Sequence, residues 1–173
     1  MAWTIDNGHS EVTFSARHMM LSTVRGRFNT FSGTIDFDEV DPVKSMVDIK
    51  IDTASIETRD EKRDGHLKSP DFFEVEKYPV MAFKSTKIEK TGAETGKLHG
   101  DLTIKGVTKP VVLDVQYNGQ AKSPWGATSA GFSGKTSIDR KDWGLTWNVA
   151  LETGGILVGD KINIEIDLEL VKQ

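Results

Sequence analysis

The chain has 173 residues, a formal net charge of −4 and an isoelectric point of about 5.6, and a chain of this length can bury a substantial core as one domain over residues 1–173. The acidic balance and the lack of a Lys/Arg run argue against a nucleic-acid partner and against electrostatic docking on anionic lipid headgroups. Cysteine is absent, which excludes disulfides, thiol nucleophiles and thiolate metal sites.

The N-terminal residues 1–6 contain neither a basic region nor an apolar run, so no signal peptide is predicted. No window approaches the ~18 apolar residues of a membrane-spanning helix, and we expect no integral membrane segment. These features predict a cytoplasmic protein. The alternative is a periplasmic or secreted protein whose leader has already been removed.

Alternation of apolar and polar residues, typical of strands with one buried face, dominates the chain. In chain order, the residues that share a predicted inward face are Val12, Phe14, Ala16 and His18; Phe31, Gly33, Ile35 and Phe37; Val47, Ile49 and Ile51; Met81, Phe83 and Ser85; Leu98, Gly100, Leu102 and Ile104; Val111, Leu113, Val115 and Tyr117; Ala130, Phe132, Gly134, Thr136 and Ile138; Trp143, Leu145, Trp147, Val149 and Leu151; and Ile162, Ile164, Ile166, Leu168 and Leu170. Such one-sided strands predict an antiparallel all-β fold.

Turn signals separate these segments, and they are rich in Gly, Pro, Asn and Asp. They lie at Asp41-Pro42, Thr91-Gly92, Asn118-Gly119, Ser123-Pro124-Trp125-Gly126, Gly154-Gly155 and Gly159-Asp160.

One segment, residues 58–73, breaks the alternation. Thr58, with Glu61 three residues later, predicts a capped helix over about residues 58–68. Ser69-Pro70-Asp71 predicts a second helix start, with serine as the cap and proline in the first turn. The residues expected to plug this helical insert onto the sheet are Leu67, Phe72 and Phe73.

About eight strands with one apolar face must bury that face in a two-sheet sandwich or a closed barrel, and periodicity alone does not choose between them. Five strings, in the same order along nearly the whole chain, resemble the YceI-like family of lipid-binding proteins: Trp3-x-Ile5-Asp6-x-x-His9-Ser10-x-Val12-x-Phe14, Arg63-Asp64-Gly65-His66-Leu67-Lys68-Ser69-Pro70-Asp71-Phe72-Phe73, Tyr78-Pro79-x-Met81-x-Phe83-x-Ser85, Gly100-x-Leu102-x-Ile104-x-Gly106-Val107-Thr108-Lys109-Pro110-Val111 and Asp139-Arg140-x-Asp142-x-Gly144-Leu145. The resemblance implies a lipocalin-like antiparallel eight-stranded β-barrel, with the helical insert near residues 58–73 and an elongated apolar cavity that holds a polyisoprenoid chain.

Small residues recur on the predicted inward face, at Ala16, Gly33, Gly100, Ala130 and Gly134. They leave volume for a ligand, or they mark bends and bulges where strands curl to close a barrel. The residues alone favour bends, whereas the resemblance favours a cavity.

The residues that we predict to contact the ligand are mainly apolar, because Met and aromatic side chains line adaptable pockets, although they also fill ordinary cores. They are Phe14, Ala16, His18, Met20, Phe31, Ile35, Met81, Phe83, Leu102, Ile104, Leu113, Val115, Phe132, Trp143, Leu145, Trp147 and Arg140.

Three polar or flexible features among them have two interpretations each. Met19-Met20-Leu21 flanks the cavity mouth or anchors an ordinary loop. His18 meets a ligand headgroup or bonds a backbone carbonyl. Arg140 pairs with a pyrophosphate or quinone oxygen, or forms a turn-stabilising ion pair with a neighbouring aspartate.

Nothing in the chain marks a catalytic or metal site. There is no Gly-x-Ser-x-Gly, P-loop or Gly-x-Gly-x-x-Gly motif, and His9, His18, His66 and His99 lack metal-ligand spacing. We therefore expect no catalytic residue, metal or cofactor, other than a bound lipid as ligand.

The predicted function is the binding, and the sequestration or transport, of a long-chain polyisoprenoid or isoprenoid quinone, by a monomer or a homodimer. The alternatives are binding of a fatty acid or other acyl lipid, an enzyme acting on an isoprenoid lipid through His18 and Arg140, and a filled barrel that serves as an interaction module.

Overall fold

The computed structural model describes residues 3–152 and 155–172. In chain order the elements are β1 (Trp3–Ile5), a 3-10 turn (Asn7–His9), β2 (Glu11–His18), β3 (Ser22–Phe28), β4 (Phe31–Asp36), a 3-10 turn (Pro42–Lys44), β5 (Met46–Asp52), a 3-10 turn (Thr53–Ser55), β6 (Ile56–Glu57), α1 (Glu61–Lys68), β7 (Val80–Lys90), β8 (Thr95–Ile104), β9 (Val107–Lys122), β10 (Thr128–Asp139), a 3-10 turn (Arg140–Trp143) and β11 (Lys161–Lys172). The predicted features at Met1, Ala2 and Gly154 lie outside the described residues.

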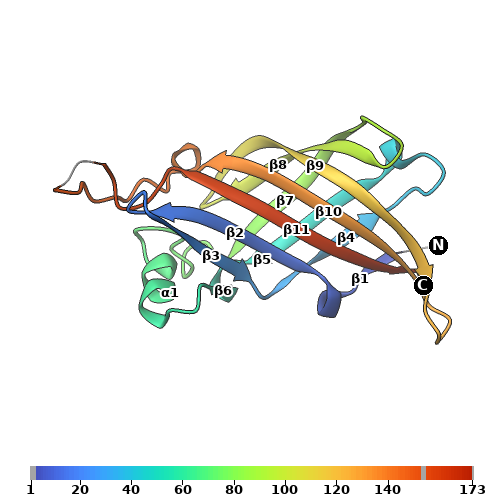
Figure 1. The fold of residues 1–173 in the computed structure, drawn as a ribbon, viewed down its shortest axis with the longest axis horizontal. Helices are drawn as coiled ribbons and strands as arrows, with labels where there is room; N and C mark the ends of the chain where they lie inside the picture. Colours follow the sequence, from blue (N-terminus) through green and yellow to red (C-terminus); the bar gives the residue numbers. More distant parts are fainter. Residues whose placement is uncertain (1–2, 153–154, 173) are drawn as a thin grey trace.

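The strands form a closed antiparallel barrel (Figure 1). Eight of them complete the ring in the order β1, β4, β5, β7, β8, β9, β10 and β11, and β11 pairs with β1 to close it. This confirms the predicted lipocalin-like barrel. Of the described helices, none is long and apolar enough to cross a bilayer.

Strand β11 has two partners along one of its edges. Its C-terminal half pairs with β1, with Leu170 opposite Ile5, and its N-terminal half pairs with β2, with Asn163 opposite Ser15. The 3-10 turn at Asn7–His9 separates these two partners. The extra strands β2, β3 and β6 therefore extend the wall beyond the ring.

The barrel has two ends, which we name by their elements. The α1 end carries α1, the β2–β3 turn (residues 19–21) and the described residues of the segment 144–160, which are 144–152 and 155–160 (Figure 1). The hairpin end carries the β4–β5 loop, the β7–β8 turn and the β9–β10 turn, and β1 begins and β11 ends on this side. The predicted turns at Thr91-Gly92 and Ser123–Gly126 are therefore confirmed.

The predicted strand over residues 143–151 is wrong. A 3-10 turn spans Arg140–Trp143, and Gly144 follows it with a left-handed φ of 81°. After that reversal the carbonyls of Leu145 and Trp147 accept hydrogen bonds from Arg140 instead of from a neighbouring strand. An apolar alternation without a paired backbone does not make a strand.

The predicted turn at Asn118-Gly119 lies inside β9 and is a β-bulge. Gly119 has a φ of 97°, and the β9–β10 register shifts next to it, so that Gly119 faces Gly131 while Tyr117 faces Phe132. The same tolerance of positive φ that favours a turn here accommodates the extra residue Asn118.

The helical insert is shorter than predicted. Asp60, not Thr58, caps α1 and accepts hydrogen bonds from the backbone of Lys62 and Arg63. Ser69 closes the helix, and turns replace the predicted second helix after it. The plug itself is confirmed, because Phe72 is buried in the main core and Leu67 and Phe73 pack against that core.

Candidate functional site: the barrel cavity

A cavity of about 920 Å³ lies inside the barrel. Its wall includes Lys62 and Trp147 at the α1 end, and Val40 and Glu94 at the hairpin end. It therefore runs along the whole barrel. This volume is at the upper end of the ~300–1,000 Å³ range typical of small-molecule sites.

Most of the predicted contact residues line this cavity; for those in strands the period-2 pattern assigned the inward face, whereas Arg140, Leu145 and Trp147 line it from a 3-10 turn and the segment that follows. They are Phe14, Ala16, His18, Phe31, Ile35, Met81, Phe83, Leu102, Ile104, Leu113, Val115, Phe132, Arg140, Leu145 and Trp147. The residues Met20 and Trp143 are not part of the wall.

Trp143 and Met20 depart from the prediction in opposite directions. Trp143 is 3% exposed, and its indole Nε1 donates to the Leu102 carbonyl at 2.9 Å, so it packs behind the wall of β8. Met20 is 63% exposed on the β2–β3 turn. Alternation predicts an inward Trp143 only if residues 143–151 form a strand, whereas Trp143 ends a 3-10 turn.

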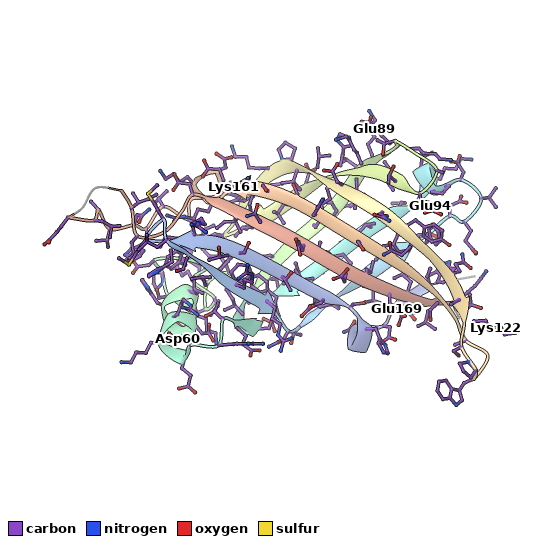
Figure 2. All side chains as sticks on the ribbon, in the orientation of Figure 1. Asp60, Glu89, Glu94, Lys122, Lys161 and Glu169 are labelled. Carbon is purple, nitrogen blue, oxygen red and sulfur yellow. The ribbon has the colours of Figure 1, made fainter. Side chains whose placement is uncertain are left out.

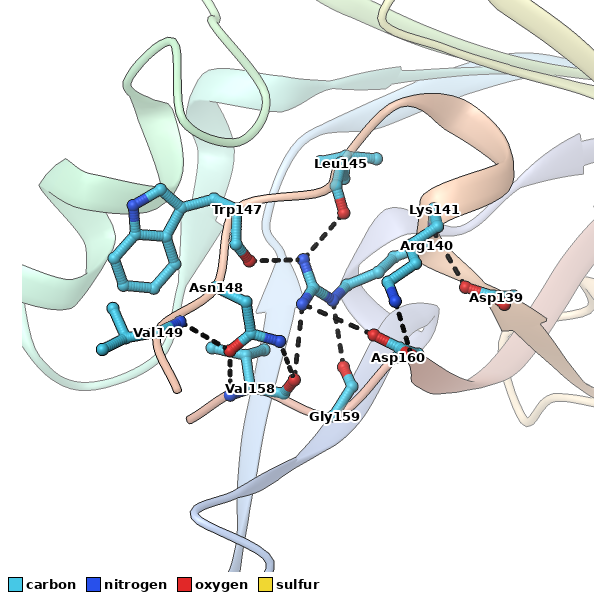
Figure 3. Close-up of polar contacts among 10 residues, drawn as sticks. All are labelled: Asp139, Arg140, Lys141, Leu145, Trp147, Asn148, Val149, Val158, Gly159 and Asp160. Carbon is cyan, nitrogen blue, oxygen red and sulfur yellow. Dashed lines mark hydrogen bonds and ion pairs between the residues drawn. The ribbon is translucent and has the colours of Figure 1, made fainter. Parts of the chain in front are cut away.

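Arg140 lines the cavity near the α1 end but is not free to bind a ligand oxygen. It is 4% exposed, and its Nε donates to the carbonyl of Gly159 at 3.0 Å (Figure 3). Its Nη1 donates to the carbonyls of Leu145 at 2.7 Å and Trp147 at 2.9 Å.

The remaining nitrogen of Arg140, Nη2, donates to the carbonyl of Val158 at 3.3 Å and lies 3.7 Å from Asp160. Each guanidinium nitrogen thus has a partner among residues of the segment that follows. We call Arg140 and these partners, Leu145, Trp147, Val158, Gly159 and Asp160, the Arg140 junction. Burial lowers the pKa of Arg140, and the facing Asp160 opposes that shift. The prediction that Arg140 meets a pyrophosphate or quinone oxygen is therefore not supported, because its donors are already used.

His18 differs from Arg140 although both lie near the α1 end. Its side chain lines the cavity, and its ring has no hydrogen bond to a residue within 3–152 or 155–172. The interpretation in which His18 bonds a backbone carbonyl is therefore wrong for this side chain. A free imidazole on the cavity wall can donate to a ligand or accept from one.

The small residues of the strands have two different roles. Gly100 and Gly26 lie outside the cavity lining, where a Cβ at Gly100 would lie 2.3 Å from the Phe83 ring, and one at Gly26 would lie 2.5 Å from the Phe14 ring. These glycines let aromatic rings lie across the wall. A Cβ at Gly134 would meet Leu113 at 3.6 Å, an ordinary contact, so this glycine leaves open space in the cavity.

Gly33 and Ala130 do not line the cavity. A Cβ on Gly33 would lie 2.1 Å from the Asp48 carbonyl, so its role is a close approach of two strands. Ala130 is buried in a second core cluster with Trp3 and Leu170. Neither position leaves volume for a ligand, and the core packing of Ala130 was predicted by neither interpretation.

The charged residues of the cavity wall differ between its ends. At the α1 end the wall includes Arg17, His18, Lys62, Arg63 and His66, and no carboxylate of the described residues. At the hairpin end it includes Glu39, Glu89 and Glu94, together with Lys90 and Lys97. Hydrogen bonding to Lys172 lowers the pKa of Glu39, and hydrogen bonding to Lys87 lowers that of Glu89.

Figure 2 shows Glu89 and Glu94 at the hairpin end and Asp60 beside α1 at the other end. Most of these charged wall residues were missed from the sequence. Lys62, Arg63 and His66 lie on α1, and Glu39 and Glu94 lie in turns, where alternation assigns no inward face; the others lie near strand ends, where charged residues were not assigned to the inward face. The YceI-like string from Arg63 to Phe73 was the one signal that pointed to part of them.

A cluster of three potential metal ligands lies outside the cavity wall. Asp6, His9 and Glu169 offer ligand atoms within 4.8 Å of one another. His9 Nδ1 lies 2.8 Å from Asp6 Oδ2, and this hydrogen bond raises the pKa of His9. The carboxylates of Asp6 and Glu169 are thus paired with the His9 imidazole beside the 3-10 turn at Asn7–His9.

Comparison with known proteins supports kinship over nearly the whole chain. The YceI-like domain profile matches residues 3–170. A UPF0312 protein of Pseudomonas savastanoi pv. phaseolicola is 40% identical over 137 residues, which cover 79% of this chain and 71% of that protein.

Two solved structures share the barrel. A Campylobacter jejuni YCEI protein superposes with a TM-score of 0.77 at 38% identity, covering 91% of this chain and 90% of that one. A polyisoprenoid binding domain from Saccharophagus degradans, implicated in plant cell wall breakdown, superposes with a TM-score of 0.69 at 16% identity and covers 98% of each chain. The profile match, the 40% identical relative and the shared barrel together place this chain in the YceI-like domain family.

Proposed function

We propose that the protein binds a long-chain apolar lipid, a polyisoprenoid or an isoprenoid quinone, inside the barrel and sequesters or transports it without chemical conversion. The observation that carries the proposal is the cavity of about 920 Å³ along the barrel, walled largely by apolar strand residues. The similarity to the Saccharophagus degradans polyisoprenoid binding domain supports this choice of ligand.

Burial of apolar groups along the cavity favours a chain-like ligand. Each buried methylene contributes ~0.8 kcal/mol, so a tail of several isoprenoid units has a driving force of tens of kcal/mol before its costs. Non-covalent affinities saturate near −18 to −21 kcal/mol, so ordering the tail and removing it from a membrane must offset most of that sum. Tail burial alone therefore supplies enough binding energy, and no specific headgroup site is required for tight binding.

Native mass spectrometry of freshly purified protein tests the ligand. We expect one long-chain adduct per chain, which denaturing conditions release and whose mass in the solvent extract identifies the isoprenoid. An acyl-lipid mass in its place supports the fatty-acid alternative. An apo mass from several expression hosts, with no uptake of added polyprenyl lipid or quinone, contradicts lipid binding.

Two substitutions inside the cavity give a second test. Leu102 lines the wall near the C-terminal end of β8, and Val115 lines it in the middle of β9. In a filled core, Leu102→Trp or Val115→Trp overpacks and typically costs ~1–3 kcal/mol. In the cavity the indole has space, so we expect near-wild-type stability without ligand, together with loss of lipid uptake.

The matched control is Asp114→Trp, at an exposed position of opposite parity on β9. It should retain lipid uptake. If Leu102→Trp and Val115→Trp both unfold the protein, or both still bind a long isoprenoid normally, the cavity is not the lipid site.

A further inference from the structure

The β2–β3 turn at the α1 end is built from residues that its geometry does not favour. Met19 and Met20 have φ angles of 53° and 60°, and the Leu21 backbone N–H closes the turn on the His18 carbonyl at 3.0 Å. Two consecutive positive φ angles in a hairpin favour Asn-Gly, because residues with a larger side chain are strained there. The turn geometry therefore does not explain two methionines.

These apolar side chains point largely into solvent. Met20 is 63% exposed and Leu21 is 78% exposed, and Val149 of the segment 144–160 is 47% exposed. Backbone hydrogen bonds join the two segments, since Met19 donates to the Leu157 carbonyl at 2.8 Å and Leu157 donates to the Val149 carbonyl at 3.0 Å. Met19, Met20, Leu21 and Val149 thus form one protrusion, which we call the apolar tip.

The apolar tip adjoins the cavity and a basic rim. His18 precedes the turn and Leu157 underlies it, and both line the cavity. Arg17, also on the cavity wall, donates through Nη2 to the Met20 carbonyl at 3.2 Å, which places a cation beside the tip. An apolar surface flanked by cations suits the boundary between the headgroups and acyl chains of an anionic bilayer.

The hairpin end also exposes an apolar residue next to the cavity, but carboxylates neighbour it in its loop. Val40 is 96% exposed, in a loop that carries Asp38, Glu39 and Asp41. These carboxylates disfavour an anionic surface. The net charge of −4 hides this difference between the ends.

We propose that the apolar tip docks on the surface of an anionic lipid bilayer and directs the α1 end of the cavity toward the lipid that it takes up or delivers. The inference rests on the proposed function for its cargo, but the docking itself needs no cargo.

Flotation of the full chain with vesicles tests the docking. The vesicles contain either phosphatidylcholine alone or equal parts of phosphatidylcholine and phosphatidylglycerol. We expect wild-type protein to float with the anionic vesicles more than with the neutral ones. The double variant Met20→Ser/Leu21→Ser should bind the anionic vesicles about tenfold more weakly than wild type, because two apolar side chains are lost from the interface.

The matched control is Met46→Ser/Trp125→Ser, which removes two exposed apolar side chains from the hairpin end, neither of them on the cavity wall, and should float as the wild type does. Equal flotation of the Met20/Leu21 variant and wild type, no flotation of wild type, or an equal loss in the control overturns the proposal.

Uptake of a polyisoprenoid from cyclodextrin separates this proposal from the proposed function. The Met20/Leu21 variant should take up lipid from cyclodextrin normally but extract it from vesicles about tenfold more slowly. If wild type takes up no lipid from cyclodextrin, the proposed function fails, while flotation still decides whether the tip docks.

Discussion

The Arg140 junction and the cavity wall around His18 lie at the same end of the barrel, yet they differ in how their polar groups are satisfied. Every guanidinium nitrogen of Arg140 has a partner in the segment 144–160 (Figure 3), whereas the His18 imidazole has none among the described residues. A buried, satisfied cation holds a chain segment in place, and an unpaired imidazole on a cavity wall is available to a ligand. The comparison predicts that the junction governs stability and the wall governs binding.

Breaking the junction should have the largest effect. Arg140→Ala leaves the carbonyls of Leu145, Trp147, Val158 and Gly159 without their donor, so we expect the free energy of unfolding to fall by on the order of 3 kcal/mol. Denaturant unfolding measures it. Arg140→Lys keeps the charge but lacks the planar fork, and should lose an intermediate amount. A loss below ~0.5 kcal/mol for Arg140→Ala is inconsistent with a stabilising junction.

The next largest effect on the free energy of unfolding is expected at one of two strand glycines, Gly100 and Gly134. Gly100→Ala places a Cβ 2.3 Å from the Phe83 ring and 2.7 Å from the Lys84 carbonyl, so a loss of ~1–3 kcal/mol is expected in the same unfolding experiment. Gly134→Ala meets Leu113 only at 3.6 Å. It should be neutral, or stabilising by ~0.4–1 kcal/mol through the unfolded chain. Equal destabilisation by both would show that the wall at Gly134 is packed rather than open.

His18→Ala should affect binding and not folding. With no hydrogen bond to lose, its unfolding free energy should stay within ~0.5 kcal/mol of wild type. Lipid affinity, measured by a fluorescent-lipid displacement titration, should fall by ~0.5–1.5 kcal/mol, or by up to ~3 kcal/mol against a charged headgroup. Lipid recovered after incubation with wild type or with His18→Ala should be chemically unconverted. A conversion of lipid by wild type that His18→Ala abolishes would favour the enzyme alternative.

The smallest effect is expected at His9, away from both regions. Its pKa is raised above 6.5, first by the hydrogen bond to Asp6 and also by Glu169, and an NMR titration should show this rise become smaller in Asp6→Asn. Because the folded-state pKa is the higher one, the pair stabilises the protein below the unfolded pKa of His9, and this contribution is lost as pH rises through the folded pKa. Chelator should leave the titration unchanged, and a chelator-sensitive shift would instead indicate a metal at Asp6, His9 and Glu169.

The misassigned segments share one physical cause, which is that local patterns do not report backbone pairing. Trp143, Leu145 and Trp147 alternate like strand residues, but the carbonyls of the latter two bond Arg140. Short strands such as β3 (Ser22–Phe28) were missed, because Arg25, Gly26 and Arg27 obscure its apolar face. That strand exists because its backbone pairs with β2 along its whole length.

The sequence by itself determined the strand faces of most of the wall, the plugging residues Leu67, Phe72 and Phe73, and the family. These properties follow from a side-chain period of 2 and from strings of residues, which are local and readable in order. Alternation, however, assigns a face and not a distance. Only the tertiary structure decided that the Arg140 guanidinium donates its hydrogen bonds to backbone carbonyls up to 19 residues away, while the His18 ring has no hydrogen bond to a described residue. It also decided that the wall residues of the two ends carry different charges, because barrel closure brings together turns and a helix whose positions no local pattern encodes.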